Sequence, residues 1–243
     1  MSGDVAEWVA RNLGFTPDEQ QARVLAPGIR RGMLNCTRQW GKSTILAAKA
    51  IHMAWHKPGS LTVVVSPSAR QSGELVRKAE DFARLLGVKV KGDGQNEISI
   101  ALPNGSRMIG LPGNEATIRG YSAVDLMLVD EAARVKKELY HAIRPMLAVS
   151  DGALWLMSTP WGKQGFFYEE WSRGGGDWER FRVPATECPR IPARVLEEER
   201  ATLGDRRFRQ EYMCEFVETE DGVFDRDLVL AAISYDFEPL KIE

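Results

Sequence analysis

The chain has 243 residues, 44% of them hydrophobic and 27% charged, and its 32 Lys and Arg nearly balance its 34 Asp and Glu. This composition excludes a disordered, collagen-like or repeat-array protein, and the length allows one large domain with at most a small appendage. The formal net charge of −2 excludes a protein that coats nucleic acid over its whole surface, so any such contact must come from a local basic patch.

The first elements are helical. Residues 1–15 place apolar side chains at helical spacing among charged ones, which predicts an amphipathic helix and not a signal peptide. The sequence Thr16-Pro17-Asp18-Glu19 has the pattern of a capping box with Pro at the first helical position. We therefore expect a second helix to begin there.

Strand-like and helix-like segments then alternate. The expected elements are a short strand ending near residue 35, a helix over 43–56, a buried strand over 61–65, a helix over 71–86, hairpin strands over 97–102 and 107–111, and apolar strands over 126–129 and 154–157. Such alternation is typical of βαβ units and predicts an α/β fold with a mainly parallel sheet covered by helices on both faces.

The pattern changes towards the C-terminus. Residues 174–176 are three glycines, which indicate a turn, and two charged helical segments follow over 194–203 and 205–214. We divide the chain into a core over residues 1–178, which includes the N-terminal helices, and a small, mostly helical subdomain over 179–243.

A phosphate-binding loop is predicted between the first strand and the helix that follows it. The sequence there is Arg38-Gln39-Trp40-Gly41-Lys42-Ser43-Thr44. In a P-loop, backbone N–H groups and the helix N-terminus hold the phosphates, the Lys reaches the β- and γ-phosphates and the Ser hydroxyl binds Mg²⁺. Cys36 stands where the motif normally has its first glycine, so the alternative is an ordinary helix that begins with these residues.

An apolar strand ends in two acids, Asp130 and Glu131. In P-loop ATPases an Asp at this place holds Mg²⁺, and the following Glu can act as the general base that activates the attacking water. The alternative is a pair of acids favoured at a helix N-terminus by the helix dipole.

The next strand ends in two hydroxyl side chains, Ser158 and Thr159. Ligands of parallel sheets lie at the carboxyl ends of the strands, so these hydroxyls are expected beside the phosphates, where they could sense the γ-phosphate. The alternative is a simple turn initiated by Ser-Thr-Pro.

Together these motifs resemble the ATPase portion of the large terminase subunit, the DNA-packaging motor of tailed bacteriophages. The segments that carry the resemblance are Arg38 to Ser43, Arg119-Gly120, Leu128 to Ala132, Ser158 to Gly162, Phe167 to Glu169, and the lid-like segment Phe208 to Val217. The resemblance runs in order from about residue 15 to about residue 225, which makes it far more specific than any single motif. It implies a P-loop fold of the RecA-like type, with an additional strand and a catalytic glutamate, and with residues 179–243 as the lid.

The resemblance also implies roles that spacing alone does not give. Gln20 would read the adenine, with Gln21 as the other candidate, and a solvent-facing helix residue is an almost equal alternative for Gln20. Arg119 would be an arginine finger acting on a neighbouring subunit's site, against the alternative of a structural ion pair. Arg38 would contact phosphate or relay the nucleotide state to the lid, and Ser158 and Thr159 would couple hydrolysis to movement.

Large terminases also carry a C-terminal RNase H-like nuclease, for which residues 222–243 leave no room. We expect this chain to be an ATPase fragment, the other possibility being a short homologue.

The expected activity is ATP hydrolysis with Mg²⁺ that drives double-stranded DNA into a procapsid. The resemblance implies the portal protein and the small terminase subunit as further partners, a homo-oligomeric ring when active, a monomer in isolation, and a place in the host cytoplasm at the portal. Lys89, Lys91 and Arg107 are a candidate strip for DNA phosphates, with an ordinary solvated surface as the alternative. A helicase- or restriction-type translocase and a non-hydrolysing P-loop assembly switch remain open as other functions.

Overall fold

The computed structural model describes residues 4–113, 118 and 120–218. A single seven-stranded sheet has the strand order β3-β4-β2-β5-β6-β1-β7. Its strands are β1 (Arg31–Cys36), β2 (Leu61–Ser66), β3 (Ser99–Ala101), β4 (Arg107–Pro112), β5 (Leu126–Asp130), β6 (Ala153–Ser158) and β7 (Glu179–Val183). Every neighbouring pair is parallel except the β3–β4 hairpin, which is antiparallel.

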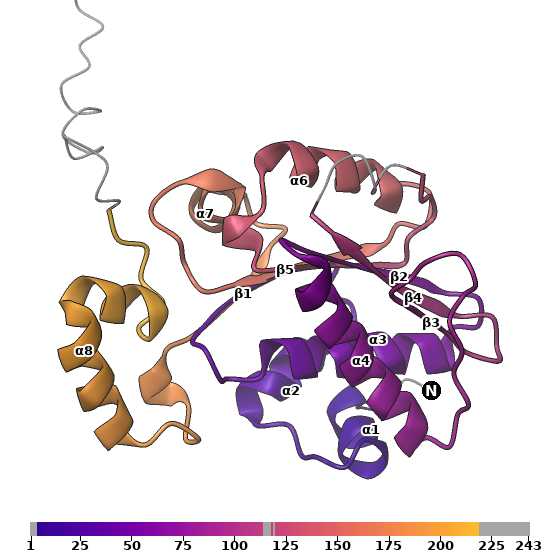
Figure 1. Ribbon diagram of the computed structural model, residues 1–243, viewed down its shortest axis with the longest axis horizontal. Coiled ribbons are helices and arrows are strands. Elements are labelled where there is room, and N and C mark those ends of the chain that lie inside the picture. The colour runs from indigo at the N-terminus through magenta and orange to yellow at the C-terminus, as the bar shows by residue number, and fades with distance from the viewer. Residues whose placement is uncertain (1–3, 114–117, 119, 219–243) are drawn as a thin grey trace, which may run out of the picture.

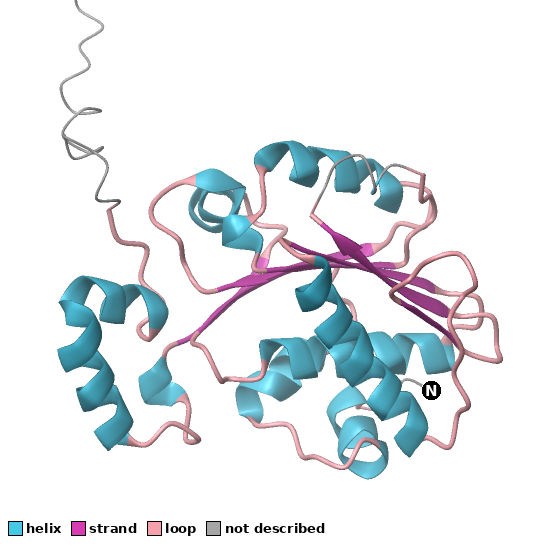
Figure 2. Cartoon of the chain, viewed as in Figure 1, coloured by secondary structure: helices cyan, strands magenta, loops and turns pink. Residues whose placement is uncertain are grey.

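Helices cover both faces of this sheet (Figure 1). The first face carries α1 (Val5–Asn12), α2 (Glu19–Leu25), α3 (Lys42–His56) and α4 (Ala69–Leu85), and the second carries α6 (Lys137–Ile143), α7 (Gly165–Arg173) and the 3₁₀ turns η1 (Ala132–Arg134) and η2 (Arg144–Leu147). Figure 2 shows the sheet as the middle of three layers. None of the helices in the described ranges is both long enough and apolar enough to span a bilayer.

The central strands are hydrophobic on both sides because both of their faces are covered. Val64 packs into the core shared with α3 and α4, whereas its neighbours Val63 and Val65 pack into the core under α6 and α7. The same alternation separates Leu128 from Val129 on β5. Side chains of a strand point to opposite faces in turn, so a continuous apolar run is what a doubly covered parallel strand requires.

The predicted α/β fold with a mainly parallel sheet is confirmed. The start of α2 differs from the sequence prediction, because the capping box uses Asp18 and Gln21, whereas the sequence suggested Thr16 and Glu19. The Asp18 side chain accepts from the Gln21 backbone N–H at 2.8 Å, and the Gln21 side chain accepts from the Asp18 N–H at 3.1 Å. Shifting the box by two residues starts the helix at Glu19 and decides which glutamine faces inward.

The expected boundary at residue 179 falls inside the structure of the core. Strand β7 begins at Glu179 and pairs in parallel with β1 along Gly32 to Cys36, so the sheet ends at Val183. The lid consists of a 3₁₀ turn, η3 (Ala185–Glu187), and the helical segment α8 (Ala193–Glu211). Gly204 interrupts α8 with φ 74°, which agrees with the two helical segments expected from the sequence. The rest of the lid expected beyond residue 218 lies outside the described residues.

Candidate functional site

A cavity of about 640 Å³ lies at the carboxyl ends of β1 and β5. Strand β6 separates these two strands in the sheet. The cavity is lined by Phe15, Thr16, Gln21, Arg38, Gln39, Trp40, Gly41, Lys42, Ser43, Thr44, Lys78, Asp130, Glu131 and Arg190. The fold therefore brings the predicted phosphate loop and the two predicted acids into one space.

The predicted phosphate loop contains two residues with a left-handed backbone. Gln39 and Gly41 both have positive φ, 65° and 99°, and α3 begins directly afterwards at Lys42. The Lys42 ammonium donates to the carbonyls of Cys36 at 2.7 Å and Thr37 at 3.1 Å. It is thus held over the loop by its own backbone, where the β- and γ-phosphates of a nucleotide would lie.

Trp40 anchors this loop in the protein's interior. Its side chain is 1% exposed and belongs to the core under α1 to α4. Its carbonyl accepts from Gln21 Nε2 at 3.1 Å and from the Arg190 guanidinium at 2.5 Å. The loop is therefore fixed from α2 on one side and from the segment before α8 on the other.

The two acids differ sharply in environment. Asp130 is 9% exposed, and burial, reinforced by the charge of Glu131, raises its pKa to about 6. One of its carboxylate oxygens accepts from the Glu131 N–H at 2.9 Å. A buried carboxylate with a raised pKa has too little positive charge around it, and a bound cation would supply that charge.

Glu131 has a left-handed backbone, with φ 48° and ψ 43°. Such a conformation is uncommon for a residue other than glycine and is often found at functional sites. Its carboxylate accepts from Arg134 at 2.6 Å and from the Ser158 hydroxyl at 3.4 Å. Arg134 and Ser158 thus hold the carboxylate at the edge of the cavity.

Oxygen ligands for Mg²⁺ are present in this cavity. The Ser43 hydroxyl at the start of α3 and the Asp130 carboxylate at the end of β5 both line it. Mg²⁺ prefers one or two protein oxygens together with phosphate oxygens and water, so this pair fits the ion. Among the described residues no cluster of three or more His, Cys, Asp or Glu could hold a metal by itself.

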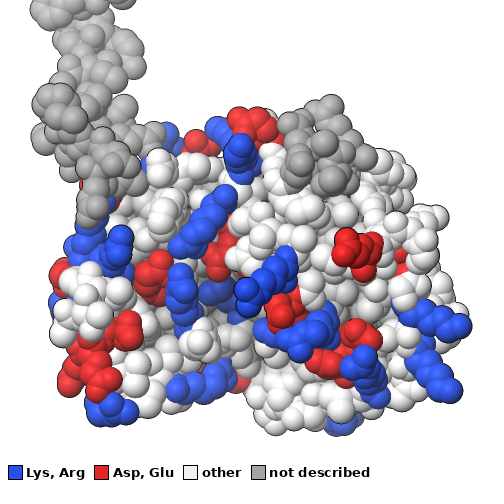
Figure 3. Space-filling model, in the orientation of Figure 1, with Lys and Arg blue, Asp and Glu red and all other residues white. Residues whose placement is uncertain are grey.

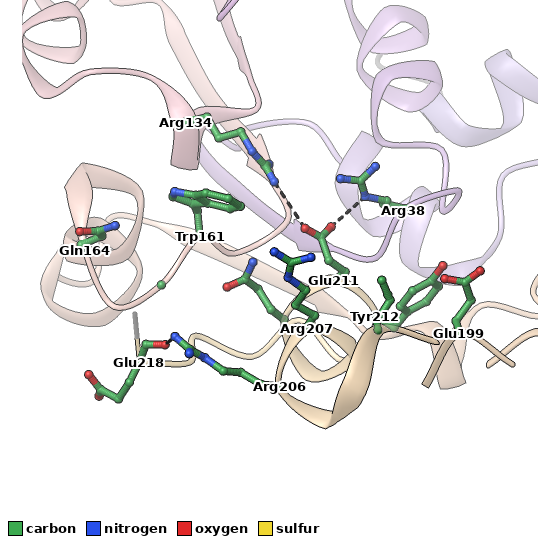
Figure 4. A pocket seen from close by; sticks show the side chains of 13 residues that line it. Arg38, Arg134, Trp161, Gln164, Glu199, Arg206, Arg207, Glu211, Tyr212 and Glu218 are labelled. Atoms are coloured by element: carbon green, nitrogen blue, oxygen red, sulfur yellow. Dashed lines mark hydrogen bonds and ion pairs between the residues drawn. The ribbon is translucent and has the colours of Figure 1, made fainter. Parts of the chain in front are cut away.

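A second cavity, of about 650 Å³, lies between the core and the lid and shares Arg38 with the first. Glu211, the last residue of α8, joins its two sides: it pairs with Arg38 at 2.8 Å and with Arg134 at 3.4 Å. Figure 4 shows both arginines converging on this carboxylate, with Trp161 beside Arg134. A chain of charged contacts therefore runs from Glu131 through Arg134 and Glu211 to Arg38.

The structure does not bring Gln20 to the cavity. Its side chain lies at the surface and accepts from Arg23 at 3.0 Å, whereas Gln21 is 5% exposed and lines the cavity. The shifted capping box is the reason, because it turns position 21 inward. Gln21, the other candidate in the sequence, therefore occupies the position expected for Gln20.

The hydroxyl side chains at the end of β6, Ser158 in the strand and Thr159 directly after it, are buried. Ser158 donates to Glu131 and lies opposite Asn35 of β1. The Thr159 hydroxyl is buried without a hydrogen-bond partner among the described residues. Neither residue lines the nucleotide-sized cavity. Arg119, the expected arginine finger, lies outside the described residues.

The three candidate DNA-contacting residues lie at the other end of the sheet. Arg107 is the first residue of β4 and pairs with Asp93 at 3.9 Å, and Lys91 bridges to Ala101, the partner of Arg107 in the hairpin. Lys89 and Lys91 are exposed. On the face seen in Figure 3, acidic and basic side chains are interspersed, which agrees with the nearly neutral composition.

Several charged residues that line these two cavities had no role assigned from the sequence, among them Lys78 on α4, Arg134 in η1, Arg190 before α8, and Glu211 at the end of α8. Arg134 follows the acid pair by three residues, a spacing that places it within reach of Glu131. The other three come from distant segments, and although Glu211 lies in the lid-like segment Phe208 to Val217, its contacts with the core were not predicted.

The chain has clear relatives among known proteins. The family "Terminase large subunit, T4likevirus-type, N-terminal" matches residues 33–230. The large terminase subunit of Thermus virus P23-45 is 26% identical over 92% of this chain and 53% of its own length, and that of Escherichia phage T5 is 25% identical over 87% and 50%. The chain thus spans about half the length of these curated relatives. The large terminase ATPase domain of Thermus phage P74-26 has a similar fold, with a TM-score of 0.78 and 24% identity over 88% of this chain and all of that one.

Proposed function

The chain belongs to the T4-like-virus type of terminase large subunits, in their N-terminal part, and on that premise we propose that it hydrolyses ATP to move double-stranded viral DNA into a procapsid. The observation that carries the proposal is the convergence of Lys42, Asp130 and Glu131 on one cavity. A cation for the phosphates, a metal ligand and a candidate base are the parts that phosphoryl transfer requires.

In this proposal the phosphates of ATP lie on the loop from Arg38 to Thr44. The Lys42 ammonium exchanges its two carbonyl partners for phosphate oxygens. The Arg38 guanidinium is the second positively charged group that contacts the phosphates. Glu131 takes the proton of the attacking water, and Arg134 with Ser158 keeps its carboxylate oriented towards that water. Ser43 and Asp130 would hold Mg²⁺, which would neutralise phosphate charge when bound.

The amide of Gln21 matches the edge of adenine. Its oxygen accepts one hydrogen bond from the Asp18 N–H, and its nitrogen donates one to the Trp40 carbonyl. An amide oxygen has two lone pairs and an amide nitrogen two hydrogens, so one acceptor and one donor are left. Adenine offers a donor at N6 and an acceptor at N7, the pair that a glutamine amide binds with two hydrogen bonds.

The lid contacts and the strand-end hydroxyls would couple hydrolysis to movement. Ser158 contacts Glu131, and Glu211 links the lid to Arg38 and Arg134. Loss of the γ-phosphate changes the charge that Arg38 and Glu131 face, and so changes the ion pairs that hold the lid. We propose Ser158 and Thr159 as coupling residues on this basis.

The wider setting follows from the family. The portal protein, the procapsid and the small terminase subunit would be the partners, and the active form would be a ring in the host cytoplasm at the portal. Lys89, Lys91 and Arg107 stay a proposed DNA strip; neutralising all three should lower DNA affinity and its salt dependence, and an unchanged salt slope would eliminate this strip.

The central test is turnover of ATP by the purified chain, with and without DNA. Wild type should release phosphate only with a divalent cation. Glu131→Gln should bind ATP with similar affinity but lose about 10²–10⁴-fold in rate, the usual worth of a general base. Lys42→Ala should lose nucleotide binding itself. A wild-type chain that binds no nucleotide, or a Glu131→Gln variant that turns over normally, would contradict the proposal.

A further inference from the structure

Arg190 lies in the nucleotide cavity, although no sequence motif marks it. It is part of a turn between β7 and α8, where the Ile191 N–H donates to the Cys188 carbonyl at 3.0 Å and a proline stands on each side, at positions 189 and 192. Proline restricts the backbone, so this turn presents the arginine in a defined position. The side chain is half exposed and lines the cavity.

The contacts of Arg190 place it beside Trp40 and Gln21. Its guanidinium donates to the Trp40 carbonyl at 2.5 Å and lies 3.6 Å from the carboxylate of Asp18, the N-cap of α2. The same carbonyl is held by Gln21. Arg190 is therefore next to the residue proposed to read adenine, whereas Lys42, Ser43 and Asp130 define the phosphate end.

Arg190 retains binding capacity beyond these contacts. A guanidinium has five N–H donors and a planar face that stacks on aromatic rings, and the contacts with Trp40 and Asp18 both use the same terminal nitrogen. Bases are commonly held by such stacking. An arginine whose only role is to hold two segments together would be expected to be buried, with all its N–H groups hydrogen-bonded, whereas Arg190 is half exposed.

We propose that Arg190 binds the base half of the nucleotide by laying its guanidinium plane against the purine. The proposal rests on the proposed nucleotide-binding function of the cavity. The lid segment would then contact the base end of the ligand directly through Arg190. It already reaches the phosphate end indirectly, because Glu211 of α8 pairs with Arg38, which is proposed to bind phosphate.

The consequence is that one helical segment is tied to both ends of the site. α8 starts at Ala193, directly after the Arg190 turn, and ends at Glu211. A ligand with a base and phosphates would contact Arg190 before α8 and Arg38, the partner of Glu211 at the end of α8. An inorganic phosphate ligand would contact only Arg38.

The test compares two ligands with matched phosphates, ADP and inorganic pyrophosphate, by calorimetric titration of the full chain in the presence of Mg²⁺. Arg190→Ala should weaken ADP binding by about 5–20-fold and leave pyrophosphate binding unchanged, because only ADP carries a base. Arg190→Lys keeps the charge without the plane and should lose most of the same ADP affinity. Arg194→Ala is the matched control: this exposed arginine pairs with Glu198 and lines neither described cavity.

The outcomes distinguish direct binding of the base by Arg190 from an effect of Arg190 on the shape of the phosphate loop. Equal weakening for ADP and pyrophosphate would show that Arg190 acts by shaping the phosphate loop, and would overturn the proposal. Unchanged ADP binding in Arg190→Ala, or full affinity in Arg190→Lys, would overturn it as well. If Arg190→Ala does not fold by its melting curve, Arg190→Lys alone decides. A wild-type chain that binds neither ligand would refute the proposed function itself.

Discussion

Gln21 shows how strongly one capping interaction controls a functional side chain. Its carboxamide closes the capping box of α2 and at the same time holds the Trp40 carbonyl of the phosphate loop. Both contacts fix the amide in one orientation before any ligand arrives. A preoriented amide loses little side-chain entropy on binding, so it can discriminate bases efficiently.

Replacing Gln21 should therefore change base selectivity more than it changes catalysis. In Gln21→Ala we expect KM for ATP to rise about tenfold and the preference for ATP over GTP to disappear, since a lost bidentate contact is worth about 1–3 kcal/mol. Gln20→Ala is the matched control, because the Gln20 side chain contacts Arg23 at the surface. Steady-state kinetics with both nucleotides measure this, and an ATP preference that survives in Gln21→Ala but not in Gln20→Ala would reverse the assignment.

At the scale of single residues, the sequence identifies side chains that belong to a local motif better than side chains that reach the site from distant segments. Lys42, Asp130 and Glu131 could be identified because each stands at a fixed step after a strand or before a helix. Arg190 and Glu211 reach the same region from segments 150 and 173 residues further along the chain than the loop residues they contact. Their roles depend on tertiary packing, which a single sequence does not encode in any local pattern.

At the scale of elements, the apolar runs predicted the strands well because both faces of the sheet are covered. The prediction failed at β7 (Glu179–Val183), in which only Phe181 and Val183 are apolar and which was assigned to the lid. An edge strand has only one neighbour and one fully covered side, so its hydrophobic signal is half that of a central strand. The start of α2 was shifted for a different reason, since two overlapping capping patterns compete there and only packing selects one.

The element with the clearest mechanical role is α8, through Glu211. The Glu211 carboxylate pairs with Arg38 and so competes with phosphate for it. Glu211→Gln should therefore bind ADP about 3–10-fold more tightly, because Arg38 no longer has to give up a charged partner. The pair with Arg38 itself should contribute little to stability, about 1 kcal/mol or less, since Arg38 is largely exposed.

Glu215→Gln is the matched control for that change. Glu215 lies in the same lid segment and pairs with Arg209 at 2.7 Å, without contacting Arg38. Calorimetric titration and thermal melting of both variants give the comparison. Tighter ADP binding in both variants would point to a general charge effect, and weaker binding in Glu211→Gln would mean that Arg38 does not move to phosphate.

At the scale of the whole molecule, the near-neutral charge and the position of the cavities both indicate that ligands bind at small, separate parts of the surface. Basic and acidic groups are mixed over the face seen in Figure 3. The Arg and Lys side chains proposed to contact nucleotide or lid line the two cavities beside the lid. The nucleotide cavity and the proposed DNA strip lie at opposite ends of the parallel strands.

A ring makes a prediction for Arg119, the proposed arginine finger. If Arg119 of one subunit completes the site of the next, Arg119→Ala and Glu131→Gln should each be nearly inactive, because an arginine finger is worth about 10³–10⁵-fold in rate. Mixing the two variants under conditions that assemble the ring should restore part of the activity, since some interfaces then join an intact Glu131 to an intact Arg119. A mixture of Glu131→Gln with the double variant cannot form such an interface and should stay inactive. Phosphate release measured across mixing ratios distinguishes these cases: recovery with a maximum at intermediate ratios supports action between subunits, whereas a linear response without recovery places Arg119 within its own site.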